Sequence, residues 1–460
     1  MWSAIKTSRN CPIDNENRKH IMNNNNVPPN NPQLSRRHFL STASKAVAGG
    51  ALIGALPVNR FAHGASGQGP LKLALIGCGG RGSGAANQAL TTGKVQLVAM
   101  ADVFPDRLQS SLTNLRNRHS DKINVTADRQ FIGFHGYKDA IAEADVVILG
   151  TPPGFRPMQF EEAVKQGKHC FLEKPVATDA PGIRRMLKAT EESKKKNLKV
   201  VVGLQRHYQP SYIETIKRIH DGAIGDVVAM RCYWNDAGVW VKPREPGWTE
   251  MEYQMHNWYY FVWLSGDHIV EQHVHNIDVC NWVKGEYPTK ARGMGGREVR
   301  TGKEYGQIYD HHAVEFEYQD GTRLFSQCRH MRGCWNNVSE HVMGSKGIAD
   351  VGGGIIRGDE RWRYRSRTRV DPYQEEHEKL MDAIINDTPL NDGYNGTMST
   401  LNGIMGRLAT YSGQQILSED VLESEIDLFP ETLAWDAMPK DLPNDEGFYS
   451  VAVPGQTVVV

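Results

Sequence analysis

The sequence lacks an excess of charge of either sign. Its 460 residues include 53 Lys and Arg and 53 Asp and Glu, so the formal net charge is zero. A chain without a basic surplus has no long-range field that attracts nucleic acid or an anionic membrane. We therefore expect no nucleic-acid partner.

Cysteine is scarce and irregularly spaced. The seven cysteines are odd in number and include no C-x-x-C pair, which argues against a disulfide framework and a zinc ribbon. His268 and Glu271 begin an H-x-x-E pattern, but Gln272 follows instead of histidine. The inverted zincin motif is therefore incomplete, and we expect no metal site.

No apolar run is long enough to span a membrane. The mildly apolar run at residues 46–58 is too short for a membrane span and is rich in Ala and Gly. It follows the segment SRRHFL at residues 35–40 and ends near His-Gly-Ala at residues 63–65. A twin arginine, a weak apolar run and a small-residue cleavage site are typical of a twin-arginine export signal. We expect residues 1–66 to be a leader outside the fold and the protein to be periplasmic.

The sequence does contain a glycine turn between an apolar run and a helix-like segment. Residues 71–76 have the length and type of a buried parallel strand. Gly77, Gly79 and Gly82 follow in the spacing G-x-G-x-x-G, which permits a tight turn and the approach of backbone to a pyrophosphate. A second apolar run ends at Asp102, whose carboxylate is suited to accept hydrogen bonds from ribose hydroxyls. The stretch predicts a dinucleotide site.

Strands continue to alternate with helices after this turn. Further buried strands are expected at residues 144–150, 169–172 and 199–203, with helical segments between them. Such alternation predicts a doubly wound parallel sheet, the architecture of a Rossmann domain, which we place at residues 67–205.

Three polar side chains fall just past the ends of these strands. They are Asp102, Thr151 and Lys174, and ligands of such sheets lie beyond the carboxyl ends of the strands. Lys174 stands in the sequence Glu173-Lys174-Pro175. A lysine held beside a nicotinamide can donate a hydrogen bond to a substrate oxygen and stabilise developing alkoxide charge.

Residues 266–282, GDHIVEQHVHNIDVCNW, are expected to form a helix with one polar stripe. Glu271, His275 and Asp278 lie on that stripe. Because Glu271 and His275 are four residues apart, the carboxylate is expected to orient the imidazole. The pair predicts a general base for the oxidation of an alcohol.

Aromatic residues crowd the segment 242–264. Their flat faces suit the stacking of a sugar ring, with Trp248, His256 and Asn257 as candidate contacts. A core or a subunit interface explains the same composition, and the sequence leaves both readings open.

The glycine turn, Asp102, Thr151-Pro152, Glu173-Lys174-Pro175 and the strand end at residues 202–206 occur in this order along the chain. Together they resemble the glucose-fructose oxidoreductase, inositol dehydrogenase and rhizopine-catabolism (Gfo/Idh/MocA) family. The resemblance implies a nicotinamide-dependent enzyme that acts on a sugar, a cyclitol or a derivative. It also implies cofactor contacts at Gly77, Gly79, Gly80, Arg81, Gly82, Asp102, Thr151, Pro152, Glu173, Lys174 and Gln205.

The resemblance further implies a second α/β domain over residues 206–460. That domain would carry a large open, mostly antiparallel sheet that often mediates oligomerisation, so we expect a homo-oligomer, dimer or tetramer. The family usually has Asp four residues before its catalytic histidine. Here Glu271 takes that place while His275 and Asp278 match, so the role of Glu271 is open.

The function expected is hydride transfer between NAD and a carbinol carbon of a sugar, cyclitol or glycoside. His275 would take the hydroxyl proton and Lys174 would stabilise the oxygen. Asp102 favours NAD, because a 2′-phosphate would meet its carboxylate. Arg81 and Arg107 keep NADP open as the cofactor.

Two alternatives remain. The first is a redox-assisted glycosidase or lyase that uses tightly bound NAD without net reduction. An exported enzyme, which has no free nicotinamide pool, favours it. The second is a non-catalytic carbohydrate-binding protein on the same scaffold, and the presence of both Lys174 and His275 argues against it.

Overall fold

The computed structural model describes residues 69–359 and 361–460. The predicted leader and twin-arginine signal lie outside these residues. No described helix combines the length and apolar character needed to cross a membrane.

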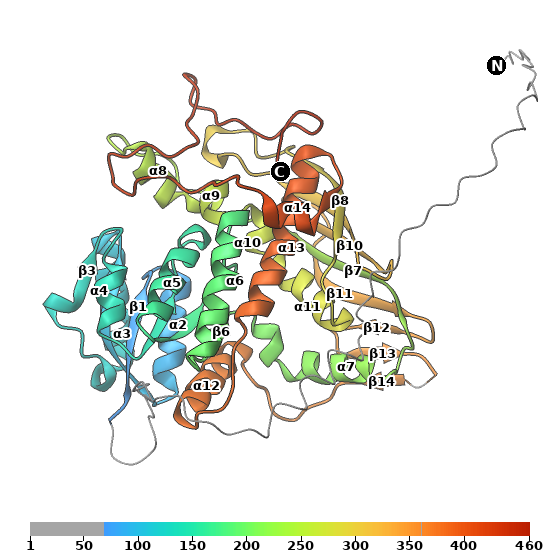
Figure 1. Cartoon of the computed structure of the whole chain (residues 1–460), viewed down its shortest axis with the longest axis horizontal. Helices are drawn as coiled ribbons and strands as arrows, with labels where there is room; N and C mark the ends of the chain where they lie inside the picture. The colour runs from blue at the N-terminus through green and yellow to red at the C-terminus, as the bar shows by residue number, and fades with distance from the viewer. Residues whose placement is uncertain (1–68, 360) are drawn as a thin grey trace, which may run out of the picture. The chain divides into compact units, whose positions relative to one another are not determined.

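A six-stranded parallel sheet forms the first part of the described chain (Figure 1). Its strand order is β3-β2-β1-β4-β5-β6. The strands are β1 (Leu71–Ile76), β2 (Val95–Asp102), β3 (Gln130–Ile132), β4 (Val146–Leu149), β5 (His169–Leu172) and β6 (Val200–Val202). The helices between them are α2 (Gly80–Thr91), α3 (Pro105–Arg118), α4 (Tyr137–Ala142), α5 (Arg156–Lys165) and α6 (Ala180–Lys195).

Both faces of this sheet are covered, as a doubly wound sheet requires. Successive residues of β1 enter different cores: Leu73 packs in a cluster with side chains of α2 and α3, whereas Ala74 packs in a cluster with side chains of α5 and α6. Continuous apolar strands such as β4, which is buried at every position, follow from this two-sided burial.

Helix α12 (Pro372–Ile385) comes from far along the chain but packs on the first sheet. Its Leu380, Met381 and Ile384 join the same core as Leu73. A helix that lies in sequence between two strands of the second sheet, β14 and β15, therefore completes one face of the first.

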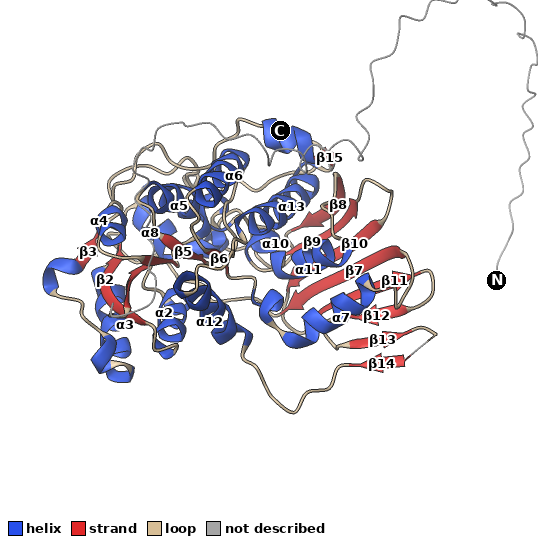
Figure 2. Cartoon of the chain, turned by 60° about the horizontal axis from the view of Figure 1, so that its bottom comes forward, coloured by secondary structure: helices blue, strands red, loops and turns tan. Residues whose placement is uncertain are grey.

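A nine-stranded sheet forms the second part (Figure 2). Its order is β14-β13-β12-β11-β7-β10-β9-β8-β15, and β10 with β7 is its parallel pair among antiparallel neighbours. The strands are β7 (Val227–Asp236), β8 (Lys290–Gly296), β9 (His311–Glu317), β10 (Arg323–His330), β11 (Asn337–Gly344), β12 (Ile348–Asp350), β13 (Ile355–Arg357), β14 (Arg361–Arg363) and β15 (Ile416–Leu417). The predicted α/β class, a parallel sheet beside a large, mostly antiparallel one, is confirmed.

Helices cover one face of the nine-stranded sheet. Figure 2 shows α7 (Pro210–His220), α11 (Val274–Lys284) and α13 (Gly393–Ser412) over the strands, and α11 and α13 contact β7, β8 and β9. The remaining helices are short: α8 (Glu250–His256), α9 (Val262–Ser265), α10 (His268–Glu271) and α14 (Ser418–Glu423).

The single helix predicted over residues 266–282 is wrong. The chain forms α10 and α11 and turns between them at Gln272 and His273. The buried His273 side chain bonds Ser326 Oγ there at 2.7 Å, and this tertiary contact accompanies the break. Glu271 and His275 therefore lie on different helices, and the rotation of 100° per residue within one helix does not place them on one face.

Candidate active site

A cavity of about 960 Å³ lies at the carboxyl ends of the parallel strands. The first sheet contributes Gly77, Asp102, Thr151, Glu173, Lys174 and Gly203 to its wall. The second part of the chain contributes Trp234, Trp240, Trp258, Glu271, Gln272 and His275. The strand-end residues predicted to meet at one edge therefore do so, and the second part closes the other side.

The glycine turn leaves a cradle that fits a pyrophosphate. Cβ atoms placed on Gly79 and Gly80 would meet nothing within 4 Å, and both glycines line the cavity. Gly77 adopts φ +88°, and a Cβ on Gly82 would lie 2.0 Å from the Gly77 carbonyl oxygen. Helix α2 begins at Gly80, so its free backbone N–H groups stand where phosphate charge is stabilised.

Asp102 lies beside this glycine turn. Its carboxylate accepts hydrogen bonds from the backbone N–H groups of Cys78 (2.6 Å) and Phe104 (2.9 Å). Burial raises the pKa of Asp102, and these hydrogen bonds and the charge of Arg107 oppose the rise. The carboxylate is thus held in one orientation at the position that suits a ribose.

Arg156 joins the ends of neighbouring strands through hydrogen bonds. The sequence alone did not predict this role. It is 1% exposed and donates to the carbonyl oxygens of Leu149 (2.7 Å), Thr151 (2.9 Å) and Glu173 (2.8 Å). Burial lowers the pKa of Arg156 to about 10, so the guanidinium is charged at neutral pH. An arginine that opens a helix gives no sequence signal that distinguishes it from a surface residue.

Lys174 reaches across the cavity to the second part of the chain. Its ammonium donates to the backbone oxygen of Glu271 and, at 3.1 Å, to that residue's Oε1. The side chains of Lys174 and Glu271 are each 14% exposed. The pair therefore links the two halves of the cavity wall and orients the ammonium.

His275 lies near this pair and is 6% exposed. Burial, and after it the charge of Lys174, lowers the pKa of His275 well below its usual range. Its Nδ1 is buried without a hydrogen-bond partner among the described residues. The ring stacks on Trp234 with centroids 6.0 Å apart, so a neutral imidazole is held in the cavity wall.

The expected partnership between Glu271 and His275 is wrong. Glu271 bonds Lys174 instead, because the break between α10 and α11 separates it from His275. Asp278 is also not brought into the cavity. It is 1% exposed and bonds His207 (2.7 Å), Ser399 (2.8 Å) and Asn395.

The predicted sugar contacts are dispersed. His256 lines the cavity, but it stacks on Phe104 at 4.0 Å, on the Asp102 side. Trp248 stacks on the other face of His256 at 4.1 Å and does not line the cavity. Asn257 is fully buried and bonds backbone groups of neighbouring loops, so it is a core residue.

Of the remaining predicted cofactor residues, Pro152 and Arg81 line the cavity and Gln205 does not. Arg81 Nε bonds Glu173 Oε1 at 2.5 Å, and its guanidinium lies 3.5 Å from Glu376 of α12. Gln205 donates to the hydroxyl of Tyr373 at 3.2 Å. Tyr373 itself lines the cavity, and its distance in sequence hid this role.

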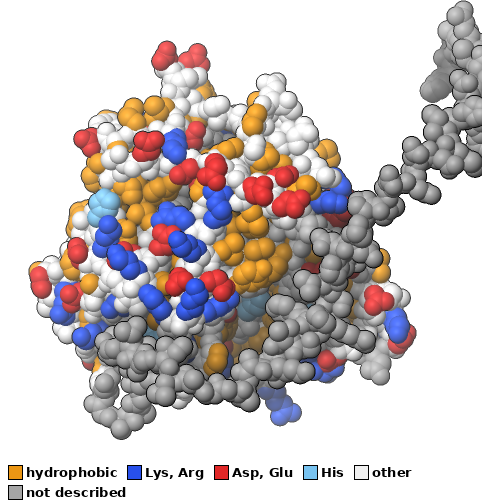
Figure 3. Space-filling view, viewed as in Figure 1, with side chains coloured by type: hydrophobic (Ala, Val, Ile, Leu, Met, Phe, Trp, Pro, Cys, Tyr) orange, Lys and Arg blue, Asp and Glu red, His pale blue; other side chains and the backbone are white. Residues whose placement is uncertain are grey.

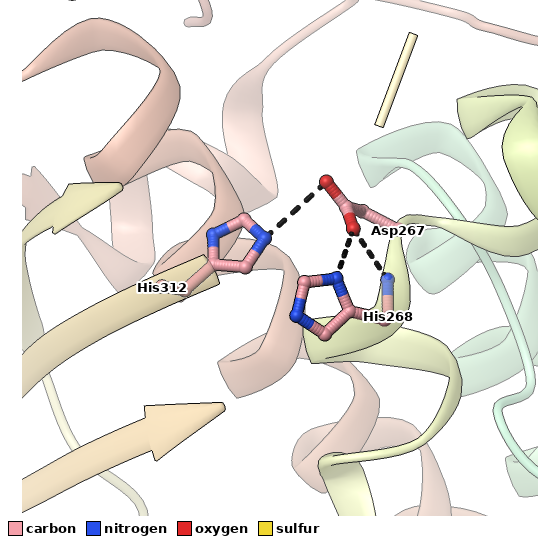
Figure 4. A group of neighbouring side chains, drawn as sticks. All are labelled: Asp267, His268 and His312. Carbon is pink, nitrogen blue, oxygen red and sulfur yellow. Dashed lines mark hydrogen bonds and ion pairs between the residues drawn. The ribbon is translucent and has the colours of Figure 1, made fainter. Parts of the chain in front are cut away.

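Asp267, His268 and His312 form a buried polar cluster (Figure 4). Ligand atoms of Asp267, His268 and His312 are within 4.8 Å of one another. The Asp267 oxygens already accept from the backbone N–H and Nδ1 of His268 (2.5 and 2.8 Å), from Tyr309 N–H (2.9 Å) and from the Tyr411 hydroxyl (2.6 Å). We interpret the cluster as a hydrogen-bonded anchor.

A Rossmann sheet whose glycine turn opens into a cavity with a lysine and an imidazole defines a nucleotide-dependent oxidoreductase. Residues 71–203 match the family described as "Oxidoreductase family, NAD-binding Rossmann fold", and residues 212–350 match "GFO/IDH/MocA C-terminal domain". The chain belongs to the Gfo/Idh/MocA oxidoreductase family. The predicted family and its NAD-type cofactor domain are thereby confirmed.

Similar proteins include inositol 2-dehydrogenase of Rhizobium meliloti (strain 1021). It is 25% identical over 254 residues, which span 55% of this chain and 66% of that protein. Among solved structures, scyllo-inositol dehydrogenase from Lactobacillus casei with bound NAD(H) and scyllo-inositol has a TM-score of 0.58 at 20% identity. Aldose-aldose oxidoreductase from Caulobacter crescentus has a TM-score of 0.59 at 17% identity. These two alignments each cover 76% of this chain and 99% of the other, and they show a shared fold.

Proposed function

We propose that the protein transfers a hydride between a carbinol carbon of a sugar, cyclitol or glycoside and a nicotinamide cofactor. The observation that carries the proposal is that Lys174, His275 and the open glycines of the turn line one cavity. The names of similar proteins, inositol dehydrogenases among them, support a polyol as the substrate.

The residues divide the chemistry between them. A nicotinamide dinucleotide whose pyrophosphate lies along Gly77–Gly82 would supply the hydride acceptor. His275 is neutral near pH 7, because burial lowers its pKa, so it can accept the hydroxyl proton. Lys174, held by Glu271, donates a hydrogen bond to the substrate oxygen as negative charge develops there.

The direct test is NADH formation by the purified protein with a panel of cyclitols, aldoses and glycosides. We expect turnover with at least one polyol and a loss of turnover in Lys174→Ala. If Lys174→Ala oxidised the same polyol at the wild-type rate, the catalytic assignment would be wrong.

We propose NAD rather than NADP as the preferred cofactor. The partly buried Asp102 carboxylate disfavours a 2′-phosphate, whereas the nearby Arg107 would favour one. Asp102→Ala is expected to lower the KM for NADP relative to NAD. A wild-type preference for NADP would reverse the assignment.

A retained nucleotide, as in a redox-assisted glycosidase or lyase, is the second candidate. His256 lines the Asp102 side of the cavity and stacks on Phe104 and on Trp248, and Trp435 packs on Phe104 at 5.3 Å. A His256 ring held in this way would slow the exit of a nucleotide. Mass spectrometry of the denatured purified protein tests this: released NAD with no net NADH during sugar turnover favours a closed redox cycle.

We propose that the open face of the nine-stranded sheet pairs with a second copy of the chain. This face carries the exposed side chains of Met294, Phe325, Met343 and Ile348 on the side away from α11 and α13. Light scattering on the wild type and on Phe325→Glu checks the pairing. On the face drawn in Figure 3, charges of both signs are interspersed with hydrophobic side chains.

Export by the twin-arginine route is also a proposal. It rests on the Arg36-Arg37 pair and on the apolar run at residues 46–58. Fractionation of cells that express the full chain, with Arg36→Lys/Arg37→Lys as the control, tests whether the protein reaches the periplasm.

A further inference from the structure

Gln272 stands in the cavity wall between Glu271 and His275, and the chemistry above does not use it. Its side-chain oxygen is approached by two donors. His330 Nε2 lies 2.6 Å from Gln272 Oε1, and the Tyr259 hydroxyl lies 3.4 Å from the same oxygen. The hydroxyl of Tyr259 can donate or accept, so the His330 contact decides which end of the amide is its oxygen.

The contact with Arg300 determines which partner donates in the hydrogen bond between His330 and Gln272. Arg300 Nη2 lies 2.6 Å from His330 Nδ1. A guanidinium only donates, so Nδ1 must accept, and in a neutral imidazole the hydrogen then sits on Nε2. Burial lowers the pKa of His330 well below its usual range, which keeps the ring neutral. His330 Nε2–H therefore donates to Gln272 Oε1.

The chain of hydrogen bonds from Arg300 through His330 to Gln272, which we call the relay, is held rigidly. Arg300 is 3% exposed, its Nη1 donates to the Tyr309 carbonyl oxygen (2.6 Å) and its backbone N–H donates to Asp310 (3.0 Å). His330, the last residue of β10, stacks on His268 with centroids 4.4 Å apart. His268 is bonded to Asp267 in the cluster of Figure 4, so the buried anchor also supports the cavity wall.

Since Oε1 is engaged, the Nε2 amide of Gln272 is the free end, and it makes no hydrogen bond to any described residue. We propose that Gln272 is a substrate-binding residue whose Nε2–H donates to an oxygen of the polyol, and that Arg300 and His330 are positioning residues that fix this orientation. The inference rests on the proposed polyol oxidation.

The recognition is chemically selective. An amide N–H accepts nothing, so a hydroxyl, ether, carbonyl or carboxylate oxygen satisfies it. A protonated amine at the same place offers only donors and leaves both groups unpaired, which costs affinity. The site should therefore favour an oxygen substituent over an amino substituent near the reacting carbon.

The test uses the full chain with NAD and four probes: myo-inositol, scyllo-inositol, D-glucose and D-glucosamine. Gln272→Leu should lower kcat/KM for the preferred polyol roughly three- to tenfold, mainly through KM, as expected for one lost neutral hydrogen bond. Calorimetry of that polyol with the NADH-loaded protein should show a matching rise in Kd. Gln456→Leu, which alters an exposed glutamine outside the cavity and outside the nine-stranded sheet, is the matched control.

Two further variants test the polarity and the relay. Gln272→Glu still accepts from His330 but turns an acceptor toward the cavity, so the ratio of glucosamine to glucose binding should rise. As a single substitution, His330→Leu should weaken polyol binding. In a Gln272→Leu background, it should cause no further loss of binding.

The outcomes separate the two proposals. If the wild type oxidises a probe while Gln272→Leu keeps the wild-type KM and Kd, only the inference about Gln272 is overturned. Additive losses in the double variant would overturn the positioning role of His330. If the wild type neither binds nor oxidises any probe, the proposed function and this inference fail together.

Discussion

Lys174 and Glu271 form an ion pair that no local sequence rule connects. The two residues are 97 positions apart, yet the ammonium donates to both a backbone and a side-chain oxygen of Glu271. A partly buried pair loses less to water and salt than a surface pair does. The contact therefore holds Lys174 in the place where a substrate oxygen would gain charge.

Lys174→Met removes this ammonium while keeping most of the side-chain volume. We expect kcat/KM to fall by roughly 100-fold or more, the usual loss when one preorganised donor to a developing oxyanion is removed. Steady-state NADH formation measures the loss. Lys165→Met, at a side chain 78% exposed, should leave turnover unchanged.

His275 should set the acid limb of the pH profile. A general base must be neutral, and burial and Lys174 lower the pKa of His275 well below its usual range. Activity is therefore expected to persist below about pH 6.5, the usual histidine value, and to fall only at lower pH. A kcat/KM profile with its midpoint above that value would contradict the assignment, and His275→Gln should remove the limb.

At the scale of elements, the turn between β1 and α2 assigns different tasks to neighbouring glycines. Gly82 permits the helix to pack on the strand, because a Cβ there would lie 2.0 Å from the Gly77 oxygen. Gly80 leaves space toward the cavity, where a Cβ meets nothing within 4 Å. One glycine serves the fold and the other serves the ligand.

This difference predicts opposite outcomes for two alanine substitutions. Gly82→Ala should destabilise the protein by about 3 kcal/mol, as severe overpacking does. Gly80→Ala should leave the unfolding midpoint near that of the wild type and weaken NAD binding. Urea unfolding and calorimetry with NAD measure the two effects. Equal loss of stability in both variants would refute this division.

At the scale of the whole molecule, buried neutral histidines make the fold sensitive to acid. Burial lowers the pKa of His268 to about 4 and that of His377 to about 3. An unfolded histidine takes a proton near pH 6.5, so between that pH and the folded pKa the unfolded chain binds more protons. Stability from these residues is therefore lost as the pH falls through this range.

His377→Phe isolates one such contribution. His377 stacks on Phe171 at 4.2 Å, and both its ring nitrogens are buried without a hydrogen-bond partner among the described residues. The variant should resemble the wild type at pH 8 and be more stable at pH 5, by about 1.4 kcal/mol for each pH unit below the usual histidine pKa. Urea midpoints at the two pH values measure this. A constant difference between variant and wild type would contradict it.

The sequence by itself determined the parallel sheet, the glycine turn and the strand-end residues Asp102, Thr151 and Lys174. These features depend on local spacing and on two-sided burial, which leave their record in short apolar runs. Sequence spacing also placed His275 in a motif, although it assigned the wrong partner.

Tertiary structure alone decided which side chains meet. The break between α10 and α11 separated Glu271 from His275 and gave the carboxylate to Lys174. Packing buried Asn257 and removed Asp278 from the cavity, while contacts across the sheets brought Arg300 and His330 behind Gln272. These contacts depend on long-range packing and on the pairing of buried polar groups, and neither produces a periodic pattern in the sequence.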